Sequence, residues 1–159
     1  IRLPLVDSTA RDLKLDETTN VAASRANPSQ QLLSGLRVLV VDDDADTLQL
    51  MTTALTSRQA TVTAVSSAGE AIEAIKASRP DVLVSDIAMP DEDGYGLIRR
   101  IRSLEDHSSS AIPAVAITAY AKEEDRRRAL SSGFQIYLAK PIELTELVSV
   151  VAKAARREF

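Results

Sequence analysis

The sequence predicts an α/β protein in which a parallel β-sheet is covered by helices on both faces. Short runs of β-branched residues recur along the chain, and each run is followed by apolar residues at helical spacing. The two patterns alternate five times between residues 36 and 159. Because parallel strands need a crossover between them, this (βα)5 order predicts a doubly wound five-stranded sheet.

The predicted strands are short and rich in Val, Ile and Leu. Residues 38–41 form a continuous apolar run, which is typical of a strand buried on both faces of a parallel sheet. The remaining strands are predicted at residues 61–65, 82–84, 115–117 and 134–138.

Apolar spacing and capping residues mark the five predicted helices. Asp44 is expected to cap the first helix, and Ser67 with Glu70 forms a capping box at the start of the second, which Pro80 closes. The apolar positions of the first, third and last helices are Leu48, Met51 and Leu55; Leu97, Ile98, Ile101 and Leu104; and Leu144, Leu147, Val148 and Val151.

The fourth predicted helix, residues 122–130, is strongly charged and stops at Gly133, which we expect to follow its end. It has little apolar face, so it should be the most exposed and least firmly packed element. Arg126, Arg127 and Arg128 follow three acidic residues, and we interpret them as part of a mixed, solvated helix face.

Composition excludes several kinds of chemistry. The chain of 159 residues has no Cys and one His, so disulfides, Cys-ligated metal sites, Cys nucleophiles and multi-histidine metal sites are ruled out. Its net charge of −4 disfavours direct binding to nucleic acid. The longest mostly apolar stretch, residues 111–121, is too short to insert through a bilayer.

Three segments are predicted along the chain. Residues 1–6 form a short apolar piece that we interpret as the remnant of a preceding domain. Residues 7–35 are polar and predict a linker, in which Pro28 suits the first position of a short helix over residues 28–33. Residues 36–159 form the folded domain.

Polar side chains follow four of the five predicted strands. Ligands of open parallel sheets bind beyond the carboxyl ends of the strands, where these side chains should converge. They are Asp42, Asp43 and Asp44 after the first strand, Asp86 after the third, Thr118 after the fourth and Lys140 after the fifth. The second strand is followed only by serines, which suits an edge strand.

Each of these residues alone has a simpler explanation as a cap, a turn residue, a β-former or a solvated charge. Together, three carboxylates, a hydroxyl and an ammonium group at one sheet edge favour a site for a hard cation and a phosphoryl group. Mg²⁺ or Mn²⁺ prefers oxygen ligands, and the clustered carboxylates would repel one another without a cation.

Four motifs in this order resemble the receiver domain of two-component response regulators. The motifs are Val38-Leu39-Val40-Val41-Asp42-Asp43-Asp44, Asp86-Ile87-Ala88-Met89-Pro90 with Asp93-Gly94, Ile117-Thr118-Ala119, and Lys140-Pro141. The resemblance covers residues 36–159. It implies a flavodoxin-like fold with strand order 2-1-3-4-5.

The resemblance assigns the chemistry to the acidic residues. Asp86 is implied as the phosphoacceptor, which takes a phosphoryl group from phosphohistidine. Asp43 and Asp86 are implied as Mg²⁺ ligands together with the backbone carbonyl of Ala88, and Asp42 acts through water.

The resemblance also assigns roles to the later motifs. Thr118 is implied to hydrogen-bond the phosphoryl group and Lys140 to pair with it. Tyr137 matches an aromatic residue that moves inward with Thr118, shifting the face formed by the fourth helix and fifth strand. Pro141, expected after a cis peptide bond, and Gly94 have structural roles.

Two further positions are expected to tune the lifetime of the phosphorylated state. Ala88 offers no polar side chain beside the acceptor, and Tyr120 is bulky enough to shield the phosphoryl group from water. These residues predict slow self-dephosphorylation. That reaction and phosphoryl transfer to Asp86 are the only catalysis that we expect of the domain itself.

The resemblance implies partners as well. The phosphodonor would be the dimerisation and phosphoacceptor domain of a histidine kinase, or a histidine phosphotransfer protein. The exposed face of the fourth helix and fifth strand suits homodimerisation. We expect the chain to be the C-terminal receiver of a hybrid sensor histidine kinase, because residues 1–5 resemble the closing strand of a kinase ATP-binding domain. We expect a cytoplasmic location, whether or not the parent kinase is membrane-anchored.

Three alternatives stay open from the sequence. One is a stand-alone single-domain response regulator. Another is a flavin-binding protein of the same fold, although the chain lacks a Ser/Thr/Gly-rich phosphate loop after the first strand and has 3% aromatic residues. The third is an interaction module that is never phosphorylated.

Overall fold

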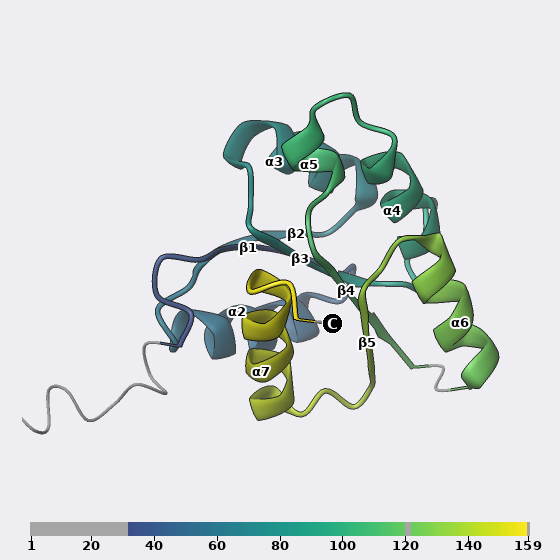
Figure 1. The fold of residues 1–159 in the computed structure, drawn as a ribbon. Helices are drawn as coiled ribbons and strands as arrows, with labels where there is room; N and C mark the ends of the chain where they lie inside the picture. Colours follow the sequence, from purple (N-terminus) through teal and green to yellow (C-terminus); the bar gives the residue numbers. More distant parts are fainter. Residues whose placement is uncertain (1–31, 120–121, 159) are drawn as a thin grey trace, which may run out of the picture. The chain divides into compact units, whose positions relative to one another are not determined.

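A parallel sheet of five strands lies at the centre of the structure, in the order β2-β1-β3-β4-β5 (Figure 1). The structure is a computed structural model that describes residues 32–119 and 122–158. The strands are β1 (Arg37–Val41), β2 (Thr61–Val65), β3 (Val82–Asp86), β4 (Ala114–Thr118) and β5 (Ile136–Ala139). The predicted parallel sheet and its strand order are confirmed.

Six helices connect and flank the strands in the described part of the chain. They are α2 (Ala45–Thr56), α3 (Ala68–Ser78), α4 (Gly94–Arg102), α5 (His107–Ser110), α6 (Glu123–Ser132) and α7 (Leu144–Ala155). Five were predicted. The additional one, α5, is a single turn capped by Asp106, whose carboxylate accepts a hydrogen bond from the Ser109 amide. Four residues are too few to produce a helical period in the sequence.

The helices form two layers, one on each face of the sheet (Figure 1). One core contains Val38, Val40 and Val84 from the sheet and is closed by α2 and α7. The other contains Leu39, Leu83 and neighbouring sheet residues and is closed by α3, α4 and α6. Burying successive side chains on opposite faces explains why the central strands are apolar without interruption.

Local sequence signals fix where the helices begin. The carboxylate of Asp44 accepts from the amide of Thr47, and the hydroxyl of Ser67 accepts from the amide of Glu70, as expected for both caps. The strand predicted at residues 134–138 is shifted, because β5 begins at Ile136. Phe134 precedes it and is buried in the core, so its apolar character reflects packing before the strand begins.

The helix α6 is the most exposed of the longer helices. Ala129 is the single buried residue among its ten, whereas α4 buries five of nine residues. Gly133 follows its end with a positive φ of 127°. The predicted weak packing of this helix is confirmed.

The described chain begins four residues before the predicted domain start at residue 36. Residues 32–35 form a turn, and Leu33 is fully buried against α2 and the first strand. The remnant predicted at residues 1–6 and most of the linker predicted at residues 7–35 lie outside the described residues. None of the helices that the structure describes is long and apolar enough to cross a membrane.

Candidate functional site

The predicted polar residues meet at the carboxyl edge of the sheet. Asp42 directly follows β1, Asp86 ends β3 and Thr118 ends β4. In the sheet register Val41 pairs with Ser85 and Asp86 pairs with Ile117, so these strand ends are level with one another. The sequence argument from strand ends therefore placed these residues correctly.

Three carboxylates form the acidic part of the site. Asp42, Asp43 and Asp86 each offer an oxygen atom, and the three oxygens lie within 4.8 Å of one another. Asp42 is 0% and Asp86 3% exposed, whereas Asp43 is exposed. Oδ1 of Asp42 accepts a hydrogen bond of 2.9 Å from the amide of Asp44, which fixes its orientation. The arrangement is an acidic cluster in which Asp43 is the exposed member.

Lys140 provides the positive charge of the site. Its Nζ lies 3.5 Å from Oδ2 of Asp42 and 3.4 Å from Oδ1 of Asp86. Its backbone amide donates a 2.7 Å hydrogen bond to the carbonyl of Thr118, so the position of the ammonium is tied to the end of β4. The Lys140–Pro141 peptide bond is cis, as expected.

The electrostatics reflect crowding and burial. Burial raises the pKa of Asp86, and the charge of Asp42 raises it further against the opposing effect of Lys140. The pKa of Asp42 is raised mainly by burial. Burial by itself lowers the pKa of Lys140, but the charges of Asp86 and Asp42 outweigh it, so that pKa lies above its usual value. The carboxylates therefore carry more negative charge than one lysine compensates.

These residues fit a divalent cation. Oδ2 of Asp42 and Oδ1 of Asp86 are buried and accept no hydrogen bond in the described part of the chain. An uncompensated buried carboxylate oxygen is costly, and two of them beside a third carboxylate suit a hard cation with oxygen ligands. The ion pairs with Lys140 are long, at 3.5 and 3.4 Å, so both oxygens retain the capacity to bind such an ion.

Thr118 and Tyr137 lie on the same face of the sheet. In the register of β4 and β5, Ala116 pairs with Tyr137 and Thr118 pairs with Ala139, and paired residues share a face. Thr118 is 1% exposed, and Tyr137 is half-buried against the core beneath α6. The hydroxyl and the aromatic ring are thus diagonal neighbours on one surface.

Gly94 lies in direct contact with the backbone of Asp86 and Ile87, at the end of β3. A Cβ at this position would lie 2.6 Å from the carbonyl oxygen of Asp86 and 2.8 Å from Cα of Ile87. Its amide donates a 2.8 Å hydrogen bond to the carbonyl of Ile87. Glycine is needed here because of this close approach. Ala88 is exposed beside it, and Tyr120 lies outside the described residues.

Sequence reasoning missed one contact near the site. The guanidinium of Arg128 on α6 lies over the ring of Tyr95 on α4, 4.1 Å from the ring centroid. Tyr95 is 5% exposed and directly follows Gly94, which touches the backbone of Asp86. The contact therefore connects the end of β3 to α6. The run of arginines was interpreted as solvated, and nothing in the sequence distinguishes Arg128 from its two neighbours.

Comparisons with known proteins agree on one family. The sequence profile of the response regulator receiver domain matches residues 38–152. An uncharacterized 14.6 kDa protein from the sodA1 3′ region of Leptolyngbya boryana is 46% identical over 121 residues, which are 76% of this chain and 91% of that protein. Hybrid signal transduction histidine kinase D of Dictyostelium discoideum is 32% identical over 134 residues, 80% of this chain but 9% of the kinase.

Solved structures agree with the sequence comparisons. The receiver domain of the Francisella response regulator 1452 superimposes with a TM-score of 0.71 at 29% identity, covering 79% of this chain and 100% of that domain. The chain thus matches a whole receiver domain in one case and a small part of a much longer kinase in another.

Proposed function

Because this chain belongs to the response regulator receiver domain family of two-component systems, we propose that Asp86 is the residue that accepts its phosphoryl group. The observation that carries the proposal is the position of Asp86. Its carboxylate ends β3 between the acidic residues and Lys140, with a buried Oδ1 that no hydrogen bond engages in the described residues. The relatives reported above do not favour a flavin-binding function.

In the proposed reaction a carboxylate oxygen of Asp86 attacks the phosphorus of a phosphohistidine. An O–P bond forms, the P–N bond breaks, and the imidazole nitrogen leaves with the bonding electron pair. Lys140 lies close enough to pair with the product oxygens. Burial of Asp86 matters as well, because it excludes water from one side of the acyl phosphate.

Asp42, Asp43 and Asp86, with the backbone carbonyl of Ala88, are the groups that would hold Mg²⁺ or Mn²⁺. When bound, the cation would neutralise charge that spreads over the transferred phosphoryl group. The chain's own contribution is the fixed Asp42 carboxylate, which its hydrogen bond from Asp44 keeps aimed at the site.

Phosphorylation is proposed to shift a pre-existing equilibrium. Thr118 would hydrogen-bond the new phosphoryl group, and Tyr137, its neighbour on the same face, would follow it inward beneath α6. The exposed α6 would report the change, since one buried residue holds it to the core. Ala88, which presents no polar side chain, and Tyr120 are proposed to keep self-dephosphorylation slow.

We expect the phosphodonor to be a histidine kinase or a histidine phosphotransfer protein, and the domain to act in the cytoplasm. The hybrid-kinase origin is supported by the kinase relative, which contains a matching segment. A stand-alone receiver is the second candidate, and it is supported by the small Leptolyngbya relative that the chain matches over nearly its whole length.

The central test is incubation of the purified chain with a small phosphodonor and Mg²⁺, followed by intact-mass measurement. The wild type should gain one phosphoryl group, and Asp86→Asn should gain none. Asp81→Asn, a variant at the opposite edge of the sheet, serves as the matched control and should be labelled like the wild type. Equal labelling of Asp86→Asn would move the acceptor to another residue.

A further inference from the structure

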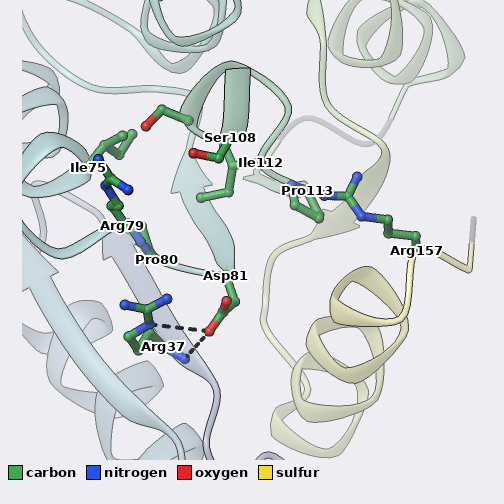
Figure 2. Close-up of a pocket in the computed structure, with 10 residues that line it drawn as sticks. Arg37, Ile75, Arg79, Pro80, Asp81, Ser108, Ile112, Pro113 and Arg157 are labelled. Carbon is green, nitrogen blue, oxygen red and sulfur yellow. Dashed lines mark hydrogen bonds and ion pairs between the residues drawn. The ribbon is translucent and has the colours of Figure 1, made fainter. Parts of the chain in front are cut away.

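A hollow lies at the opposite, amino edge of the sheet (Figure 2). It has a volume of about 350 Å³ and is formed where β1, β3 and β4 begin. Arg37 comes from the sheet, Arg79 from the end of α3 and Arg157 from the end of α7. Since α3 and α7 cover opposite faces of the sheet, three cationic side chains converge on this hollow from all three layers of the fold.

Arg37 is held in place by its surroundings. Its Nε lies 3.5 Å from Oδ2 of Asp81, and its Nη1 donates a 3.1 Å hydrogen bond to the carbonyl of Ser78. The same carboxylate oxygen accepts from the backbone amide of Arg37 at 2.9 Å. A guanidinium carries five N–H donors in a rigid plane, and these contacts leave Nη2 without a partner among the described residues.

Arg79 and Arg157 are more available than Arg37. Both follow the last turn of a helix in the left-handed conformation, with φ of 47° and 59°. Neither guanidinium makes an ion pair or hydrogen bond with the residues that the structure describes. Figure 2 shows that the Arg157 side chain extends toward Pro113 from the side of α7. Both side chains are therefore free to coordinate a ligand.

The charge balance of the lining is positive. Three guanidinium groups face one carboxylate, that of Asp81. The carboxyl ends of α3 and α7 each contribute about half an elementary negative charge, which leaves about one positive charge. Two further charged groups nearby, Asp106 beside Arg79 and the half-buried Arg102 beside Arg157, cancel each other. A positive hollow in a chain of net charge −4 indicates an anionic ligand.

The walls of the hollow add a second property. Ile75 is 0% and Ile112 2% exposed, and Pro113 is buried beside them, so closely packed residues close the hollow behind its polar rim. The volume is within the range of roughly 300–1,000 Å³ that is usual for small-molecule sites. Guanidinium groups match the oxygens of phosphate and carboxylate in paired hydrogen bonds. We propose that this hollow binds a small phosphate- or carboxylate-bearing molecule through Arg37, Arg79 and Arg157.

The test is a calorimetric titration at constant ionic strength, made on Asp86→Asn so that anions cannot react at the acidic site. The probes are inorganic phosphate, pyrophosphate, adenosine monophosphate and citrate, each up to millimolar concentration. At least one should bind, and the double variant Arg79→Gln with Arg157→Gln should weaken that binding at least tenfold. Tighter binding of the nucleotide than of phosphate would identify a phosphate ester, and tighter binding of citrate a carboxylate.

The matched control is the double variant Arg99→Gln with Arg127→Gln, which removes two exposed arginines that do not line the hollow. It should bind like the parent. Amide NMR signals of Asp81 and Ala114 should shift on titration of the parent. Equal weakening in the control, or shifts confined to residues elsewhere, would overturn the proposal. So would an absence of binding by all four probes. These outcomes are independent of whether Asp86 is the phosphoacceptor.

Discussion

The two edges of the sheet carry opposite charge, and the charged groups are buried at the carboxyl edge but exposed at the amino edge. At the carboxyl edge, Asp42 and Asp86 are buried and share one lysine at 3.5 and 3.4 Å. At the amino edge, Arg37 and Asp81 pair at a similar 3.5 Å, but their side chains are 53% and 39% exposed. Distance alone would rank the two ion pairs as equals, so burial must decide which one affects stability and pKa.

The two ion pairs differ in their exposure to water. An exposed pair competes with solvent and ions, and is worth about 0–1 kcal/mol. A buried charge has given up its hydration, so removing its partner costs several times more. The carboxyl edge should therefore respond strongly to substitution, to pH and to divalent cations, and the amino edge weakly. Five expected outcomes test this contrast, from the largest effect to the smallest.

Replacing Lys140 by Met should have the largest effect. It leaves Asp42 and Asp86 buried without a counter-charge, and should lower the free energy of unfolding by about 3–5 kcal/mol in urea denaturation with a chelator present. Lys122→Met is the control, because Lys122 is exposed and caps α6 without a side-chain hydrogen bond. A loss below about 1 kcal/mol for the Lys140 variant would erase the contrast between the edges.

Divalent cations and pH should act on the carboxyl edge together. Mg²⁺ at a hundred times its dissociation constant should stabilise the fold by about 2.7 kcal/mol near neutral pH. Without it, stability should rise as pH falls through the raised pKa values of Asp42 and Asp86 towards the ordinary value of 3.8, because the folded state binds these protons more tightly than the unfolded chain.

Other carboxylates act in a different pH window. The pKa values of Asp44, Glu70 and Glu143 are lowered by their hydrogen bonds, so their stabilisation is lost only at more acid pH, below their unfolded values. Thermal melts of the wild type and Asp86→Asn across this range separate the two contributions. A stability profile that is the same in both proteins would contradict the assignment to Asp86.

Gly94→Ala should destabilise the fold by about 1–3 kcal/mol and slow phosphorylation, because the new methyl group meets the backbone of Asp86 and Ile87. Gly69→Ala tests the opposite case. A Cβ at Gly69 has no neighbour within 4 Å, and its place in α3 should make alanine stabilising by about 0.5–1 kcal/mol. Chemical denaturation of both variants measures the difference, and similar effects would mean that the close approach at Gly94 is relaxed easily.

The contact between Tyr95 and Arg128 should contribute about 0.5–1 kcal/mol. A double-mutant cycle with Tyr95→Leu and Arg128→Met measures this coupling free energy directly. The same cycle with Arg127→Met in place of Arg128→Met should give almost none, since Arg127 pairs with Glu123 at 3.6 Å on the surface of α6. Equal coupling in both cycles would show that α6 responds only to its total charge.

The smallest effect is expected at the amino edge. Arg37→Gln removes the exposed ion pair but retains the backbone hydrogen bond to Asp81, and should change stability by less than about 1 kcal/mol. Added salt should reduce even this difference, because exposed charges are screened. Urea denaturation at low and high salt provides the check, and a larger, salt-independent loss would mean that this edge is electrostatically as strong as the other.

The carboxyl edge could be predicted from the sequence because topology determines it. Once five apolar runs alternate with helical periods, every strand end arrives at the same edge, and the residue that follows each strand is known. Asp42, Asp86, Thr118 and the cis bond before Pro141 were placed in this way or by the family resemblance, and the structure agrees.

Three other features could not be predicted, because they depend on which side chains meet in the folded structure. Such meetings leave no periodic pattern in the sequence. Arg128 covers Tyr95 while its neighbours on α6 stay in water, and the three sequence positions look alike. The hollow at the amino edge combines Arg37, Arg79 and Arg157, whose separation in sequence gives no hint that they meet. The turn α5 was missed because its four residues are capped by one aspartate rather than packed by an apolar face.

The exposure of α6 has a consequence for how such a domain can diversify. Ala129 is its single buried residue and Arg128 contacts Tyr95, so the other eight of its ten positions can change with little cost to the core. The acidic cluster and the sheet that carries it allow no comparable freedom. Surface substitutions on α6 can thus change what this helix recognises without altering the carboxyl edge of the sheet.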